Sequence, residues 1–175
     1  MMRGISMEDD NNNGEENSQL IDEMAVHVKA MLELIGLDLS VSDLKDTPRR
    51  VAKMQLEIFS GLDASKEPKI TVFPNEDDYH SMVVVRDIPF YSVCAHHLVP
   101  FFGIGHIAYI PSDCIVGLSK IARILEFFAR RPQVQERLTQ QTADYLEGKI
   151  NPQGVMVVLE ARHLCMEMRG VEKPG

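Results

Sequence analysis

The sequence predicts an α+β fold, with two leading helices followed by strands, a pair of helices and a final strand. Between residues 18 and 64, apolar residues recur every three or four positions, as they do on one face of a helix. After about residue 65 the apolar runs become short and β-branched, and Pro, Asn, Asp or Gly separate them, which is typical of strands. Helices and strands do not alternate regularly, so a parallel βαβ sheet is not expected.

The 175 residues divide into three predicted regions. Residues 1–17 carry five acidic side chains against a single arginine and include an Asn-Asn-Asn-Gly run, which cannot bury a core, so they are predicted to be a disordered acidic tail. Residues 18–64 are predicted to be an N-terminal helical region. Residues 65–175 are predicted to form the main domain.

Both leading helices have recognisable ends. Ser18 is suited to cap the first helix and Gly36 to follow its last turn. The second helix is predicted to begin at Thr47-Pro48, since proline is favoured at the first helical position, and to end near Gly61. Arg50 and Lys53 are three residues apart and therefore share one face of this helix.

The main domain is predicted to alternate between β-branched runs and two helical segments. The predicted strands are Lys69–Phe73, Met82–Ile88, Phe90–Val93, Ile104–Ile110 and Gly154–Met168. The predicted helices are Leu118–Arg130 and Val134–Glu147. They are separated at Arg131-Pro132, because proline interrupts the helical hydrogen-bond ladder.

Composition excludes several classes of protein. The chain is 45% apolar and 25% charged, which are globular proportions. It contains no run of 18 apolar residues and no signal-like N-terminus, so we expect a cytoplasmic protein without a membrane partner. The net charge of −8 and the lack of a basic run argue against nucleic acid as a partner. Three cysteines favour thiols, metal ligands or a nucleophile over a disulfide framework.

One Cys/His segment has the spacing of a metal site. Cys94 and His97 are three residues apart at a Pro-bounded corner after a predicted strand, and thiolate with imidazole suits zinc. A second segment places His163 and Cys165 two residues apart, on one face of a strand. Three protein ligands would leave a position for water, as in catalytic zinc sites. Buried thiols without metal remain the alternative, and Cys114 is predicted to be such a thiol.

Basic residues are grouped in three places despite the negative net charge. These groups are Arg50 and Lys53 on the second helix, Ser119, Lys120 and Arg123 after Gly117, and Arg169 near the chain end. A Gly-x-Ser-Lys segment that enters a helix offers backbone N–H groups, a hydroxyl and an ammonium to a phosphate. The groups suggest one polyphosphate site, and solvated surface cations are the alternative.

A carboxylate lies shortly after Arg131-Pro132, where the two predicted helices are separated. Gln135 and Glu136 begin the last predicted helix, and a carboxylate that accepts two N–H bonds can recognise an N–H/NH₂ edge such as that of guanine. A surface glutamate without a ligand is the alternative and is favoured when this segment is considered alone.

Five motifs in this order resemble those of the GTP cyclohydrolase I family, and they extend from about residue 18 to the chain end. They are Asp46-Thr47-Pro48-Arg49-Arg50-Val51-Ala52-Lys53-Met54, Cys94-Ala95-His96-His97, Gly117-Leu118-Ser119-Lys120, Arg131-Pro132-Gln133-Val134-Gln135-Glu136-Arg137-Leu138-Thr139 and His163-Leu164-Cys165.

The resemblance implies a tunnelling fold, an antiparallel sheet with two helices on one face, which makes residues 65–175 the catalytic domain. It implies a homodecamer of stacked rings with active sites between subunits. It further implies zinc-dependent conversion of GTP to 7,8-dihydroneopterin triphosphate and formate, the first step of pterin synthesis of the folate and tetrahydrobiopterin type.

The resemblance also implies a role for each site residue. Zinc would be held by Cys94, His97 and Cys165, and His96 and His163 would be the acid/base groups. The triphosphate would be held by Arg50, Lys53, Ser119, Lys120, Arg123 and Arg169. Guanine would be held by Glu136 with help from Gln135, and Ser119 would assist at the ribose.

Two departures from the family pattern affect these expectations. Family members normally have Glu where this chain has Ala95. They also usually continue with a Ser/Thr-rich strand and a final helix beyond the residues present here, and loss of those elements would weaken the sheet and the assembly of the ring. A relative that binds zinc and GTP without completing the reaction, and a structural-zinc assembly protein without nucleotide, are the competing hypotheses.

Overall fold

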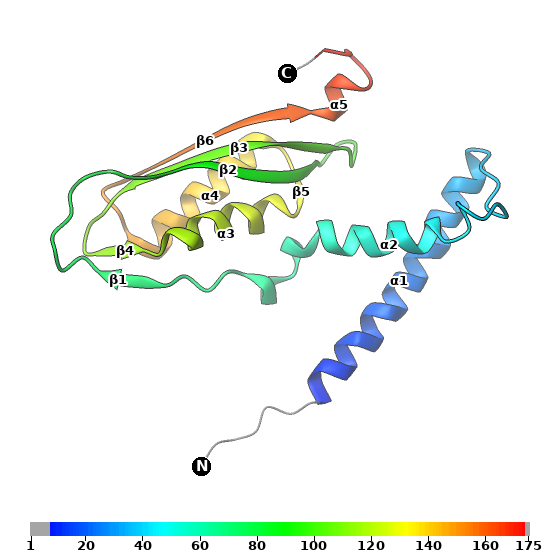
Figure 1. The fold of residues 1–175 in the computed structure, drawn as a ribbon, viewed down its shortest axis with the longest axis horizontal. Coiled ribbons are helices and arrows are strands. Elements are labelled where there is room, and N and C mark those ends of the chain that lie inside the picture. The colour runs from blue at the N-terminus through cyan, green and yellow to red at the C-terminus, as the bar shows by residue number, and fades with distance from the viewer. Residues whose placement is uncertain (1–7, 174–175) are drawn as a thin grey trace. The chain divides into compact units, whose positions relative to one another are not determined.

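The computed structural model describes residues 8–173, which form two compact units, one up to Glu57 and one from Ile58 onward (Figure 1). The boundary that the sequence predicts between residues 64 and 65 falls inside the second unit. Within residues 8–173, no helix combines the length and apolar composition needed to span a bilayer.

The first unit contains α1 (Glu8–Leu34) and α2 (Thr47–Ile58) up to its last residue, Ile58, which belongs to the second unit. The start of α1 at Glu8 corrects part of the predicted tail, whose residues 1–7 lie outside the described residues. Extending a nucleated helix adds one hydrogen bond for each residue fixed, so the polar segment before Ser18 can join it. Gly36 ends α1 as predicted, at φ +91°, where Leu37 N–H donates to Leu32 O.

The second unit contains a four-stranded sheet in the order β5-β2-β3-β6. Its strands are β2 (Val83–Cys94), β3 (Pro100–Ile110), β5 (Pro132–Gln133) and β6 (Gly154–His163). The β2/β3 and β3/β6 pairs are antiparallel, and β5 adds a short parallel pair at the end of β2. A separate antiparallel pair joins β1 (Val72–Pro74) to β4 (Cys114–Val116).

Two predicted strands are in fact one. β2 runs through Pro89, with a bulge between Val85 and Ile88 and with Asp87 at φ +59°. β5 pairs with β2 only near Cys94, so around Pro89 the side of β2 that faces β5 forms no inter-strand hydrogen bonds. Proline, which lacks an N–H donor, is therefore tolerated there. The predicted final strand is also shorter, since β6 ends at His163 and the short helix α5 (Leu164–Glu167) follows.

Two helices cover one face of the sheet (Figure 1). They are α3 (Leu118–Ala129) and α4 (Gln135–Ile150), close to the predicted ranges. Their apolar side chains and those of the inner sheet face form the core, which includes Phe90, Phe101, Ile107, Leu125 and Leu138. Burial of these side chains is the main force that holds the helices on the sheet.

The opposite face of the sheet is left with apolar side chains in solvent. Tyr91 on β2, Ile104 on β3 and Met156 and Val158 on β6 are all exposed. Tyr91 stacks on Phe102 of the neighbouring strand, with ring centroids 5.9 Å apart. The described chain is therefore a mixed α+β protein whose antiparallel sheet has one covered face and one open face.

Candidate active site

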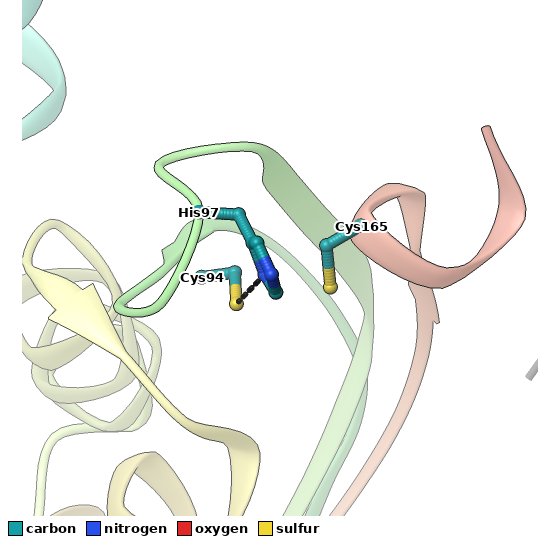
Figure 2. Close-up of side chains that lie close together, drawn as sticks. All are labelled: Cys94, His97 and Cys165. Atoms are coloured by element: carbon teal, nitrogen blue, oxygen red, sulfur yellow. Dashed lines mark hydrogen bonds between the residues drawn. The ribbon is translucent and has the colours of Figure 1, made fainter. Parts of the chain in front are cut away.

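Three side chains with metal-ligand atoms come together at one end of the sheet. Figure 2 shows that Cys94 at the end of β2, His97 from the turn that follows and Cys165 from α5 point toward one another. Their ligand atoms all lie within 4.8 Å of one another, and Cys94 Sγ is 3.7 Å from His97 Nδ1. The two segments are far apart in sequence, so the sheet brings the predicted ligand set together.

The first ligand pair sits in a tightly bonded turn. The Cys94 N–H donates to Val99 O at 2.9 Å, and the Leu98 N–H donates back to Cys94 O at 2.9 Å. Leu98 has φ +53°, a conformation that leucine rarely adopts. The Ala95 N–H donates to Gln133 O at 2.8 Å, so β5 also holds this turn. The position of Cys94 and His97 is therefore fixed by backbone hydrogen bonds.

The third ligand is placed by strand register. His163, the last residue of β6, pairs with Phe101 near the start of β3, and α5 then turns Cys165 toward the end of β2. The Arg162 guanidinium forms an ion pair with Glu167 at 2.5 Å across the β6–α5 junction. This pair lowers the pKa of Glu167, and it holds the junction that carries both His163 and Cys165.

The donor set fits zinc. Two thiolates and one imidazole are ligands that zinc favours, and tetrahedral bond lengths place a sulfur and a nitrogen ligand about 3.6 Å apart. The 3.7 Å between Cys94 Sγ and His97 Nδ1 matches that separation. Burial beside Cys94 raises the pKa of the Cys165 thiol, and the charge of Arg169 opposes this shift. A bound cation would favour the thiolate form of both cysteines.

The site has a buried side and an open side. Cys94 is buried, Cys165 is half-buried and His97 is exposed. His96 is also exposed next to His97, with the two ring centroids 6.1 Å apart. Three protein ligands with an exposed side leave room for a fourth ligand from solvent, which is the arrangement of catalytic rather than structural zinc.

His163 lies beside the metal-ligand group on a rigid support. Its ring stacks on the buried Phe101 ring, with centroids 4.8 Å apart and planes 6° apart. Its Nε2 is 2.8 Å from Gln135 Oε1. Gln135 and Glu136 form the start of α4, so the helix brings both predicted guanine-binding residues to the same end of the sheet. Glu136 is exposed there.

The predicted phosphate-binding residues do not meet in one place within the second unit. Arg169 follows α5 at the metal end, where its charge acts on Cys165. Ser119, Lys120 and Arg123 lie in the first half of α3, which begins next to β4. The metal-ligand group lies toward the other end of this helix, where β5 follows in the chain (Figure 1). The twelve residues of α3 span about 18 Å.

The remaining predicted residues belong to other elements. Arg50 and Lys53 are exposed on α2 in the first unit, and Arg50 forms an ion pair with Asp46 at 3.7 Å. Cys114, predicted to be a thiol without metal, lies on β4 with Sγ 3.5 Å from Ile150 O. Among the described residues, Cys114 is not a member of the metal-ligand group.

Sequence reasoning missed three supporting groups. They are the Gln133 carbonyl that holds Ala95, the Phe101 ring under His163, and the Leu159 carbonyl that accepts from Gln135 Nε2 at 2.9 Å. Main-chain carbonyls leave no mark in a sequence, and Phe101 looks like any other apolar strand residue. The β2/β5 pairing, the β3/β6 register and the bond from α4 to β6 reveal these contacts.

Comparison with known proteins identifies the family of this chain. Residues 24–175 match the family model described as GTP cyclohydrolase I. A protein of Carboxydothermus hydrogenoformans named GTP cyclohydrolase 1 is 51% identical over 155 residues, which cover 88% of this chain and 80% of that protein. One of Lysinibacillus sphaericus with the same name is 55% identical over 150 residues, which cover 85% and 78%. The chain therefore belongs to the GTP cyclohydrolase I family.

Proposed function

We propose that this chain is a zinc enzyme that hydrolyses GTP to 7,8-dihydroneopterin triphosphate and formate, the first step of pterin synthesis. The observation that carries the proposal is the convergence of Cys94, His97 and Cys165 next to His163, at the end of the sheet where α4 begins. Membership of the family supports GTP as the substrate.

The chemistry requires water activation and several proton transfers. Zinc held by Cys94, His97 and Cys165 would lower the pKa of a bound water, which supplies a nucleophile at neutral pH. His96 and His163 are the proposed acid/base groups, since imidazole titrates near the working pH. One of them protonates N7 of guanine as C8 is attacked. Opening of the five-membered ring, release of C8 as formate, and rearrangement and closure of the ribose carbons consume one water overall.

In the proposed site, a carboxylate binds the guanine of the nucleotide and cations bind its triphosphate. We assign the N–H/NH₂ edge of guanine to the Glu136 carboxylate at the start of α4. The triphosphate is assigned to the Ser119-Lys120 segment, Arg123 and Arg169, together with Arg50 and Lys53 on α2. Ser119 is also assigned to the ribose. Cations that neutralise the triphosphate account for three basic groups in a chain of net charge −8.

We further propose a tunnelling fold that assembles as a homodecamer with active sites between subunits. Two observations support this assembly. Ser119 and Lys120 lie at the opposite end of α3 from the metal-ligand group, so a second copy is the simplest source of phosphate-binding residues near the zinc. Within the described residues, β6 pairs only with β3 along its ten residues, which leaves a long strand edge available to a neighbouring subunit.

Incubation of the full chain with GTP and zinc tests the proposed activity. Formation of the pterin absorbance and fluorescence together with stoichiometric formate is the expected result. A protein that retains zinc but neither binds GTP nor forms pterin would instead support the structural-zinc assembly hypothesis.

Replacement of Glu136 by Gln is expected to weaken GTP binding by about 10- to 100-fold, because one acceptor oxygen becomes a donor that faces N–H groups. GTP should bind the unmodified protein far better than ATP, and the variant should lose most of this preference. Calorimetric titration of both nucleotides into zinc-loaded protein measures this effect. Glu147→Gln, an exposed glutamate of the same helix, is the control. Equal affinities of the unmodified protein for GTP and ATP would contradict the assignment of guanine recognition to Glu136.

Replacement of Ala95 by Glu is expected to raise turnover by about 10- to 100-fold, with zinc content and GTP affinity nearly unchanged. Alanine cannot accept a hydrogen bond, so any neighbour that relied on the family's carboxylate lacks its partner here. The Ala95 N–H still donates to Gln133 O, so the turn itself is in place. Turnover and GTP affinity are measured on both forms at matched zinc content.

Ala64→Glu adds the same charge at an exposed position outside the turn that carries Cys94 and His97, and it serves as the control. Unchanged turnover in Ala95→Glu would make Ala95 a neutral replacement. Binding of GTP by both forms without pterin formation would favour the relative that binds zinc and GTP without completing the reaction.

A further inference from the structure

We propose that Gln135 is a positioning residue for His163, which fixes the orientation of the imidazole ring and the nitrogen that carries its proton. This inference rests on the proposed function, in which His163 is an acid/base group. It differs from the role in guanine binding that the family resemblance implies for Gln135.

The Gln135 amide has only one orientation compatible with its partners. Its Nε2 lies 2.9 Å from Leu159 O, and a carbonyl oxygen can only accept, so the NH₂ group must face Leu159. The amide oxygen then faces His163 Nε2 at 2.8 Å. Because an amide oxygen cannot donate, His163 Nε2 must be the donor and carry the proton.

The remaining freedom of the ring is removed by packing. The His163 ring lies parallel to Phe101, 6° from coplanar and 4.8 Å between centroids, and Phe101 is 1% exposed. Stacking on Phe101 fixes the plane of the His163 ring, and the hydrogen bond to Gln135 opposes a half-turn flip of the ring about its Cβ–Cγ bond. Gln135 is anchored in turn because it begins α4 and bonds to the backbone of β6.

This arrangement assigns distinct tasks to the two ring nitrogens. Nε2 is used to bind Gln135, and within residues 8–173 no hydrogen bond is formed by Nδ1. Nδ1 is therefore the nitrogen left to exchange a proton with the substrate. The amide oxygen of Gln135 and one of its two N–H groups are engaged by His163 and Leu159 O, which ties this side chain to His163 and to β6.

Gln135→Met tests the proposal because methionine keeps the length and volume of the side chain but has no hydrogen-bonding amide. The first readout is magic-angle-spinning NMR at a single pH on zinc-loaded full-length protein labelled with ring-¹⁵N histidine. The His163 signal, identified by its loss in His163→Asn, should show the Nε2–H form in the unmodified protein and a mixture of tautomers in Gln135→Met.

The second readout compares the effects of the substitution on kcat and on KM. Gln135→Met should lower kcat by about 10- to 100-fold, with KM for GTP and zinc content changed less than twofold, since misplacement of a catalytic group affects the chemical step. Gln140→Met, an exposed glutamine of the same helix, should leave the His163 signal and kcat unchanged.

A rise in KM with unchanged kcat, or a His163 tautomer unaffected by Gln135→Met, would overturn the positioning role. Gln135→Glu provides a further check, because it keeps the oxygen acceptor for His163 but loses the donor to Leu159 O. It should retain the Nε2–H form. The NMR readout needs no turnover, so failure of the unmodified protein to convert GTP would overturn the proposed function while the Gln135–His163 relation is still tested.

Discussion

Cys165→Ala is expected to lose zinc and to abolish turnover. The ligand atoms of Cys94, His97 and Cys165 lie within 4.8 Å of one another, and removal of one leaves two protein ligands, too few for a tightly held catalytic zinc. Zinc affinity should fall by more than about 100-fold, beyond what loss of a supporting hydrogen bond costs. Cys94→Ala and His97→Ala should behave in the same way. Metal content after gel filtration with a mild chelator, and pterin fluorescence, measure the two effects.

Cys114→Ala is the matched control. Cys114 is a half-buried thiol on β4 whose Sγ lies 3.5 Å from the Ile150 carbonyl oxygen. The control should retain zinc and turnover. Full zinc occupancy in Cys165→Ala would contradict the assignment of the third ligand.

Gly103→Ala is expected to destabilise the second unit by about 3 kcal/mol or more. A methyl group at Gly103 would contact the Glu160 carbonyl oxygen far inside van der Waals distance and would lie 2.7 Å from Ala161 Cα. These are backbone atoms of the paired strand β6, so they cannot rotate away as the end of a side chain would. Relief requires separation of β3 from β6, the register that delivers His163 and Cys165 to the site.

Thermal unfolding at matched protein concentration measures this effect, and zinc content shows whether the site is lost with the register. Gly148→Ala on α4 is the control, because a Cβ there meets nothing within 4 Å. It should stabilise the protein by about 1 kcal/mol, the difference between alanine and glycine inside a helix. Equal midpoints for Gly103→Ala and the unmodified protein would show that β6 shifts without cost.

The fold was predictable where local chemistry dominates. Gly36 adopts the positive φ expected after the first helix, and Thr47 begins the second. The prediction was wrong where tertiary pairing overrides a local signal. Pro89 predicts the end of a strand, yet β2 continues through it. Around Pro89, β2 pairs with β3 on one side and has no paired strand on the other, so the missing N–H is tolerated. The final run bends into α5 at Leu164, which brings Cys165 beside Cys94.

The sequence by itself determined the chemistry available to this protein. Thiols and an imidazole at zinc-ligand spacing, a carboxylate at a helix start, and cations in an acidic chain are properties of residue type and local spacing. The tertiary structure decided which of these groups meet: it joins Cys165 to Cys94 and His97, Gln135 to His163, and leaves Ser119 at the other end of α3. The physical reason is that strand register and helix packing depend on contacts between segments distant in sequence, which local propensities do not encode.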